Sequence, residues 1–254
     1  MLKVHFPVDV HSDEATYDIQ FGNVTRKLHT NTSWDQAKFE VCGHKWADLS
    51  EGSYGVSLMN DCKYGYSMKD RVMTQTLIKS GTEPNLTADQ EEHSFTYSLY
   101  PHAGTWREAG TVQEALNLNV PAKAVFGAAE KDRMEFLSAD KRNVVLETVK
   151  KAEDGDGMIV RLYEVENART KVTLHCAESI LSAEETNLLE QPADGAIDVK
   201  ENEISLTINR TRSVRSASAQ RNNVQKHKKT PYPKTEIRCL FKSKIKKTDA
   251  SVAG

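Results

Sequence analysis

The sequence of 254 residues is poor in cysteine and has no long apolar run. Its four cysteines, Cys42, Cys62, Cys176 and Cys239, form no CxxC pair, which argues against a disulfide framework or a structural zinc site. We expect the first three in apolar, strand-like surroundings, where free cysteine behaves as a small hydrophobe. No apolar run approaches the ~18 residues of a membrane-spanning helix, and the N-terminus resembles no signal peptide. We therefore expect a cytoplasmic protein without a membrane partner.

The sequence also has little net charge, −2, but the charges are unevenly distributed. Residues 209–254 carry 13 Lys and Arg against 2 Asp and Glu, whereas the rest of the chain carries 21 against 34. This basic tail is rich in Ser and Asn and offers little to bury, so we expect it to be disordered, or to arise from a frameshift. A nucleic-acid role for the tail is disfavoured, because no stacking or base-reading motif accompanies the charge.

Alternating apolar and polar residues, the pattern of half-buried strands, dominate residues 1–208. The runs 2–10 and 15–21 are expected to form a hairpin. Further strands are expected at the segments 72–78, 95–99, 142–150, 157–167, 171–176 and 203–208, and the acidic segment 80–93 reads as an exposed loop. A single short helix is predicted from Trp106 to about Leu118, capped by Thr105 or a neighbour and followed by Pro121. The fold class is therefore all-β.

The region 31–66 carries the most specific motifs of the chain. NTSWD is followed in order by FEV, HKWADLSEG and YGVSLMNDCKYGY, and later by EEHSFTYSLYPHAG. These motifs resemble the C-terminal region of the α-mannosidases of glycoside hydrolase family 38, with the similarity strongest to the bacterial and cytosolic branch. The resemblance runs from about residue 2 to about residue 208.

The resemblance implies a fold and a division of labour. Residues 1–130 would form part of a galactose-mutarotase-like supersandwich and residues 131–208 a smaller β-sandwich-like subdomain, with the boundary between residues 121 and 140. In the family this module packs on an N-terminal α/β barrel, which supplies the nucleophilic aspartate, the acid/base carboxylate and the ligands of a zinc ion. We therefore expect no catalytic residue, metal ligand or cofactor in this chain. Because its first strand begins at residue 2, we expect a truncated gene product that is inactive alone.

Candidate contacts to an α-mannoside lie after the apolar run 56–59. They are Asn60, Asp61, Lys63 and Tyr64, on a loop held by a sheet. In the family a basic residue, commonly arginine, follows the strand that matches residues 72–78, and Lys79 stands there, without arginine's bidentate fork. The other reading is that Asn60 and Asp61 are ordinary turn residues.

Two further sets of residues have a structural and a functional reading. Trp34, Trp46 and Trp106 are candidates for stacking on sugar rings, but core packing is the favoured reading. The histidines show neither HExxH nor His-x-His, so metal ligation is disfavoured. The alternative to the mannosidase reading is a β-sandwich that binds carbohydrate or protein without catalysis.

Overall fold

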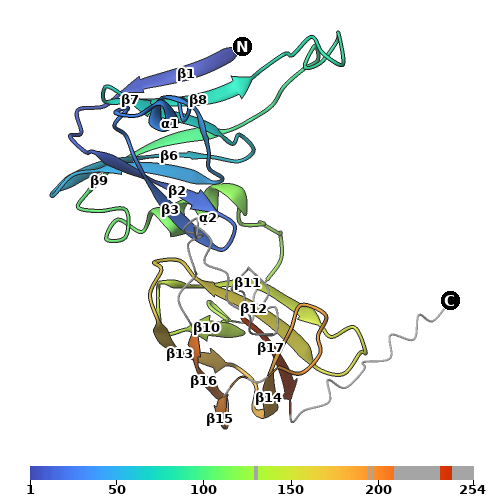
Figure 1. The fold of residues 1–254 in the computed structure, drawn as a ribbon. Helices are drawn as coiled ribbons and strands as arrows, with labels where there is room; N and C mark the ends of the chain where they lie inside the picture. Colours follow the sequence, from blue (N-terminus) through green and yellow to red (C-terminus); the bar gives the residue numbers. More distant parts are fainter. Residues whose placement is uncertain (129–130, 194, 196, 209–234, 242–254) are drawn as a thin grey trace, which may run out of the picture. The chain divides into compact units, whose positions relative to one another are not determined.

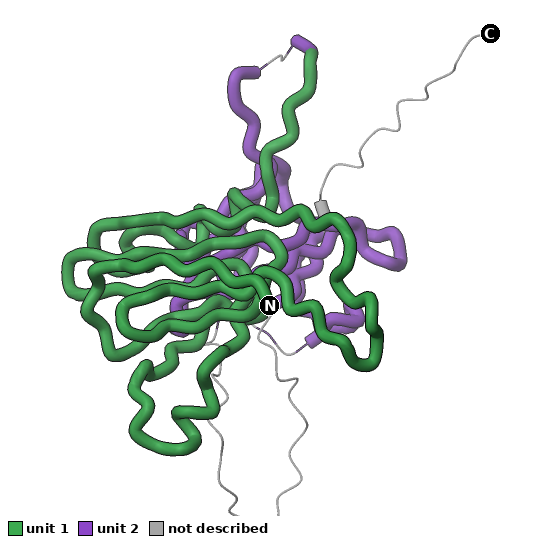
Figure 2. The backbone as a smooth tube through the Cα atoms, turned by 90° about the horizontal axis from the view of Figure 1, so that it is seen from above, with its two compact units in different colours: residues 1–126 green, residues 127–254 purple. Residues whose placement is uncertain are grey.

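The computed structural model describes residues 1–128, 131–193, 195, 197–208 and 235–241, and these form two compact units, 1–126 and 127–254 (Figure 2). The break between Phe126 and Gly127 falls inside the boundary region 121–140. Most of the basic tail 209–254 lies outside the described residues.

Unit 1 contains two antiparallel sheets and two helices (Figure 1). The five-stranded sheet has the order β3 (Gly22–Lys27), β2 (Glu14–Ile19), β5 (Trp46–Ser50), β6 (Tyr54–Asn60) and β9 (Tyr97–Ala103). The four-stranded sheet has the order β1 (Leu2–Pro7), β8 (Val72–Ile78), β7 (Gly65–Lys69) and β4 (Val41–Cys42). The helices are α1 (Ser33–Gln36) and α2 (Thr111–Asn119).

The five-stranded sheet of unit 1 is covered on both faces. Alternate residues of β2, β5 and β6 pack against Tyr66, Met68 and Met73 of the other sheet, so the sheets form a sandwich. On the opposite face Trp46 packs against Trp106, with ring centroids 5.0 Å apart, beside Ala115 of α2. Figure 1 shows this sheet between α2 and the β1–β8–β7 layer. Period-two alternation thus supplies two cores, one on each side of the sheet.

The predicted hairpin of residues 2–10 and 15–21 is wrong. β1 pairs with β8, whereas β2 pairs with β3 and β5 in the other sheet. Both runs alternate because Phe6 from one sheet and Tyr17 from the other reach the same core. The segment between β1 and β2 therefore crosses between two facing sheets.

The helix predictions need two corrections. α2 begins at Thr111 rather than Trp106, because Gly110 adopts a left-handed conformation with φ of 69° and residues 106–110 form turns. A second helix, α1, exists, and it has a capping box in which Thr32 and Asp35 exchange hydrogen bonds. Its four residues are too few to show an apolar periodicity.

Unit 2 is a β-sandwich of two antiparallel four-stranded sheets. One sheet has the order β10 (Leu137–Ala139), β13 (Thr170–Cys176), β16 (Glu203–Ile208) and β15 (Asp198–Lys200). The other has the order β11 (Val144–Lys151), β12 (Met158–Glu164), β17 (Thr235–Phe241) and β14 (Ile180–Thr186). One buried apolar cluster draws on both sheets, including Leu162 and Ile237 from one and Leu174 and Ile204 from the other. The predicted all-β fold is confirmed.

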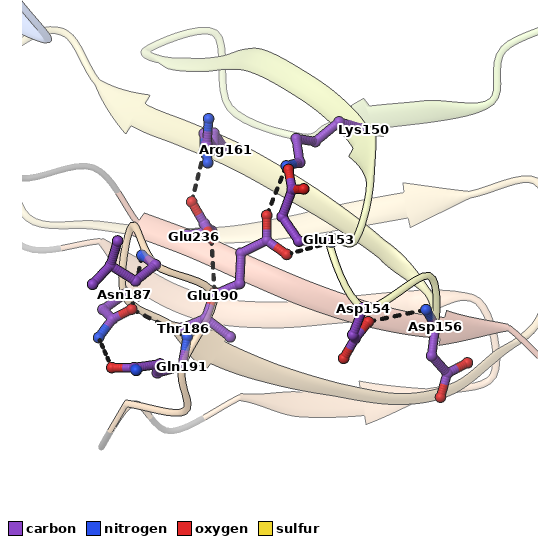
Figure 3. Close-up of polar contacts among 11 residues, drawn as sticks. Lys150, Glu153, Asp154, Asp156, Arg161, Thr186, Asn187, Glu190, Gln191 and Glu236 are labelled. Carbon is purple, nitrogen blue, oxygen red and sulfur yellow. Dashed lines mark hydrogen bonds and ion pairs between the residues drawn. The ribbon is translucent and has the colours of Figure 1, made fainter.

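The prediction of a disordered tail is wrong for residues 235–241, which form β17 between β12 and β14. Ile237 and Cys239 are buried in the core. Figure 3 shows the buried Glu236 carboxylate accepting hydrogen bonds from Arg161 Nε (2.6 Å) and from the Thr186 hydroxyl (3.2 Å). The strand was missed because its short alternation stands among basic residues that dominate the local composition.

The cysteine predictions are correct only in part. Cys42 and Cys62 are exposed rather than buried, because Cys42 ends the short edge strand β4 and Cys62 lies in the loop between β6 and β7, whereas Cys176 and Cys239 are buried. Burial raises the pKa of the Cys239 thiol to about 12.

Candidate functional site

Strand register gathers the predicted site residues at one end of unit 1. Asn60 ends β6 opposite Tyr97, the first residue of β9. Gly65 begins β7 opposite Thr76, near the end of β8, and Lys79 directly follows β8. The loop from Asn60 to Tyr64 therefore crosses between the two sheets beside the end of β8 and the beginning of β9, so one end of the sandwich carries all five predicted residues.

Asn60 has a structural function. Its side chain is buried, and Nδ2 donates to the His44 carbonyl (2.9 Å) and to the Tyr66 hydroxyl. Its Oδ1 accepts the backbone N–H groups of Cys62 (3.0 Å) and Lys63 (2.5 Å). These contacts fix the turn that presents the next residues, and they use both polar atoms of the side chain.

Asp61, Lys63, Tyr64 and Lys79 supply the accessible polar groups. Asp61 is exposed, and its Oδ2 accepts the Thr96 N–H at 3.0 Å. Its partial burial opposes ionisation, but hydrogen bonds from Cys62 and Thr96 outweigh this and hold the pKa of the carboxyl below its usual range. Tyr64 and Lys79 are exposed, while the partly buried Lys63 places Nζ 4.7 Å from the Phe95 ring centroid.

A small cavity of about 120 Å³ opens at this loop. It is lined by His44, Lys45, Asn60, Asp61, Tyr64 and Asn119. The rings of His44 and Tyr64 meet edge to face at 5.3 Å, and Asn119 Nδ2 donates to the Asn60 carbonyl at 3.0 Å. Burial, together with the charge of Lys45, lowers the pKa of His44, so this imidazole is neutral at pH 7.

Asp18, a buried carboxyl group at the end of β2, adjoins this region and was not predicted from the sequence. Burial raises its pKa to about 6, although the Lys45 N–H, which donates to Oδ2 at 3.0 Å, and the Lys45 charge act in the opposite direction. The sequence shows only an aspartate shortly before a turn, because the burial arises on folding and the contact comes from Lys45, far along the chain and just before β5. A carboxyl group with a raised pKa beside a loop is typical of functional sites.

The tryptophans separate into two classes. Trp46 and Trp106 are core residues, whereas Trp34 in α1 is 80% exposed. Among the described residues, no three His, Cys, Asp or Glu side chains converge in a group able to hold a metal ion. Likewise, no helix in the described part of the chain is long and apolar enough to cross a membrane.

The region at the end of β6 combines an ionised carboxylate, a phenol hydroxyl and ammonium groups on a loop fixed by Asn60. Such groups hydrogen-bond to hydroxyl-rich ligands.

The buried Asp48 and His102, joined at 2.8 Å on the α2 face of the sheet, are sealed from solvent with both side chains 2% exposed. They therefore hold the fold together rather than reach a ligand.

Comparison with known proteins identifies the two units. Residues 1–87 match the family model for the glycosyl hydrolases family 38 C-terminal domain, and residues 143–211 match the model for the family 38 C-terminal beta sandwich domain. The chain is 41% identical over 212 residues to human alpha-mannosidase 2C1 and 39% identical over 216 residues to Dictyostelium discoideum alpha-mannosidase G. These alignments cover 81% and 83% of this chain and 20% of each relative.

A solved structure supports the fold. The alpha-mannosidase from Enterococcus faecalis V583 superposes with a TM-score of 0.65 at 20% identity, covering 81% of this chain and 25% of that chain. The chain thus spans about a fifth of the length of the curated relatives that it matches. With both C-terminal family models matched in order, the chain belongs to glycoside hydrolase family 38 and carries its C-terminal β-sheet region.

Proposed function

We propose that this chain acts as the C-terminal part of an α-mannosidase that hydrolyses terminal α-mannosides in oligosaccharide catabolism. The observation that carries the proposal is its 41% identity over 212 residues to human alpha-mannosidase 2C1. Its partner is an N-terminal α/β barrel that supplies the nucleophile and the acid/base carboxylate. Retaining glycosidases need two carboxyl groups ~5 Å apart across the sugar, so this chain alone does not turn over substrate.

The divalent metal of the family, typically zinc, also belongs to the barrel in this proposal. The described residues do not fit a metal ion, because no three ligating side chains converge. No step in this chain therefore involves the metal. A cytoplasmic location is part of the proposal, and the exposed free thiols of Cys42 and Cys62 suit a reducing compartment.

In the assembled enzyme, the loop after β6 contributes to the rim of the sugar pocket. Asp61 accepts hydrogen bonds from mannose hydroxyls, for which its ionised state suits it. Tyr64 and Lys79 are exposed donors, and Lys63 is held against Phe95. Asn60 acts indirectly, because its side chain fixes the turn.

The role of Asp61 is tested in a chimera that joins the N-terminal part of human alpha-mannosidase 2C1 to this chain. We expect Asp61→Ala to lower kcat/KM for an aryl α-mannoside at least ~10-fold, a loss of about 1.4 kcal/mol of transition-state stabilisation, with Tm unchanged. Asp140→Ala is the matched control, since Asp140 also accepts a backbone N–H, that of Thr173 at 2.8 Å, but lies in unit 2. A lower Tm with unaltered kcat/KM would assign Asp61 to the turn alone.

A further inference from the structure

A second cavity lies on unit 1 between two unpaired sheet edges. β3 is the edge of the five-stranded sheet and β4 is the edge of the four-stranded sheet. The segment 28–40, which includes α1, connects these edges. Residues from both edges and from this segment line a cavity of about 520 Å³, among them Arg26, His29, Lys38, Phe39 and Val41. The cavity therefore results from the sandwich topology, because two edge strands remain apart and their connection arches across the gap.

Arg26 faces the interior of the sandwich from β3. Its neighbours at two-residue spacing, Val24 and Leu28, pack on the core between the sheets, so Arg26 points to the same side. Its Cζ lies 4.7 Å from the centroid of the Tyr17 ring, whose hydrocarbon body forms part of the cavity wall. Nη1 is buried and makes no hydrogen bond to any described residue. A buried donor without a partner costs about 1–3 kcal/mol, so this guanidinium favours an added acceptor.

The charges around the cavity favour an anion. Four cationic side chains, Arg26, Lys27, Lys38 and Lys69, line it against the single carboxylate of Asp35. That carboxylate is engaged by the Thr32 hydroxyl (2.7 Å), His29 (3.4 Å) and Lys38 (3.6 Å). Lys27 is paired with Asp13 and Glu14 outside the cavity. Among the described residues, Arg26 and Lys69 have no carboxylate partner, so their charges are available to a ligand.

The remaining walls suit a ligand with a body beyond the anionic group. Tyr17 and Tyr66 form a buried aromatic floor, with ring centroids 6.0 Å apart. Phe39 is 78% exposed at the rim, where an apolar ring face can stack on it. The volume also falls within the range of small-molecule sites, ~300–1,000 Å³.

We propose that this cavity binds a small organic oxyanion, a phosphate ester or carboxylate attached to a sugar-sized body, through Arg26 with Lys69 and Lys38 at the rim. A guanidinium offers two parallel N–H donors to such a group. The site is distinct from the loop after β6, because its cavity and that of the loop share no lining residue. The competing role for an inward charge on an edge strand is to prevent edge-to-edge pairing.

Isothermal titration calorimetry of the full chain at low ionic strength tests the proposal, with glucose 6-phosphate, gluconate, inorganic phosphate and glucose as probes. We expect saturable binding of glucose 6-phosphate or gluconate, weakening as salt is added, and none of glucose. Comparing these two probes distinguishes phosphate from carboxylate, and inorganic phosphate shows whether the sugar body contributes. A specific site of this kind is expected to bind with a Kd well below ~10 mM. If none of the three anions binds at concentrations up to ~10 mM, the proposal is overturned.

Three variants locate the binding. Arg26→Met keeps the aliphatic stem and should lower the affinity for the bound probe at least ~10-fold. Arg26→Lys should retain only part of the affinity, because lysine lacks the two parallel N–H donors of the guanidinium. Lys69→Gln, at an exposed position, should weaken binding without affecting folding. Arg107→Met is the matched control, since Arg107 also stacks on an aromatic ring, Trp106 at 4.3 Å, outside the cavity. If the wild type, Arg26→Lys and Lys69→Gln bind the probe with equal affinity, the site is refuted. Arg26 would then serve only to prevent edge-to-edge pairing of β3.

Discussion

At the residue scale, Asp18 is a buried carboxyl group whose ionisation opposes folding. Its pKa is raised to about 6, chiefly by burial, from an ordinary value of 3.8. The folded protein therefore binds more protons than the unfolded chain between these pH values. The associated stability is complete below about pH 4 and is lost as the pH rises through about 6.

Asp18→Asn should consequently stabilise unit 1 near neutral pH. The amide oxygen still accepts the Lys45 N–H, but the buried charge disappears. Because one pKa unit corresponds to about 1.4 kcal/mol, we expect the free energy of unfolding at pH 7.5 to rise by up to about 3 kcal/mol, with almost no change at pH 4. Urea unfolding followed by tryptophan fluorescence reports on unit 1, which holds all three tryptophans. A gain of equal size at both pH values would contradict this explanation.

Asp48 forms a second buried network, joining the five-stranded sheet to α2. Its carboxylate accepts hydrogen bonds from His102 Nε2 (2.8 Å) and Ser57 Oγ (2.7 Å). The Ser57 hydroxyl is in turn hydrogen-bonded to the Thr111 hydroxyl (2.8 Å). Burial alone would lower the pKa of His102, but the hydrogen bond and charge of Asp48 outweigh it, so the pKa is raised. The resulting stability is complete below about pH 6.5 and is lost as the pH rises through the raised value.

Removing the Asp48 carboxylate should therefore lower the free energy of unfolding more at acidic pH than at basic pH. We expect Asp48→Ala to lower the free energy of unfolding at pH 6 by about 3–5 kcal/mol, because it leaves buried partners unpaired. The loss should be smaller at pH 9 than at pH 6, because deprotonation of His102 at rising pH removes its charge from the pair. Asp9→Ala serves as the control: Asp9 meets His11 at 3.7 Å on the surface, where such pairs contribute about 1 kcal/mol or less. Urea unfolding at both pH values measures this difference. A loss of stability that is the same at pH 6 and pH 9 would exclude an ionic contribution from the pair.

Sequence reasoning at this scale identified surface residues better than buried ones. Asp61 and Tyr64 follow an apolar run, so their position on an exposed loop was predictable from neighbours in sequence, whereas Asn60 is the buried last residue of β6. The raised pKa of Asp18 was not predictable, because it comes from burial in the folded sandwich, which outweighs the opposing effect of Lys45 just before β5. The pairing of Asp48 with His102 joins residues 54 positions apart and leaves no local pattern.

At the element scale, β17 completes the second sheet of unit 2. It is the only described strand that pairs with β14, and it also pairs with β12. Ile237 is fully buried within it, while Leu181 on neighbouring β14 is 62% exposed. We expect Ile237→Ala to destabilise unit 2 by about 2–5 kcal/mol and Leu181→Ala by much less.

Hydrogen exchange measured by mass spectrometry checks the role of β17. Ile237→Ala should accelerate exchange in peptides from β12 and β14 while leaving those of unit 1 unchanged. Equal protection in the Ile237→Ala and Leu181→Ala variants would show that β17 contributes little to the sandwich.

The sequence predicted strands correctly where the alternation of apolar and polar residues was clear, but it did not predict which strands pair. The strand predicted at 72–78 matches β8, whose β-branched residues suit a pleated sheet. Pairing was wrong for β1 and β2, because alternation shows which face is buried and not which strand is adjacent. The start of α2 was misplaced because the conformation of Gly110 is invisible in an apolar periodicity.

At the scale of the whole molecule, the two units correspond to two consecutive family models, at residues 1–87 and 143–211. The all-β fold was predictable because alternation extends through both units. The organisation beyond residue 211 was not, since β17 returns to the sheet after an intervening stretch of different composition. The anionic-ligand cavity was also missed, because its walls come from the edges of two different sheets, which face each other only in the folded sandwich.

The most direct test compares hydrolysis of an aryl α-mannoside, with zinc added, by the purified chain and by its chimera with the N-terminal part of human alpha-mannosidase 2C1. Catalysis in this account needs groups on both parts. The chain alone should therefore release no more product than buffer, and the chimera should turn over at a rate typical of glycosidases, on the order of 1–10³ per second. Turnover at such a rate by the chain alone, or a folded chimera without activity, would contradict the account.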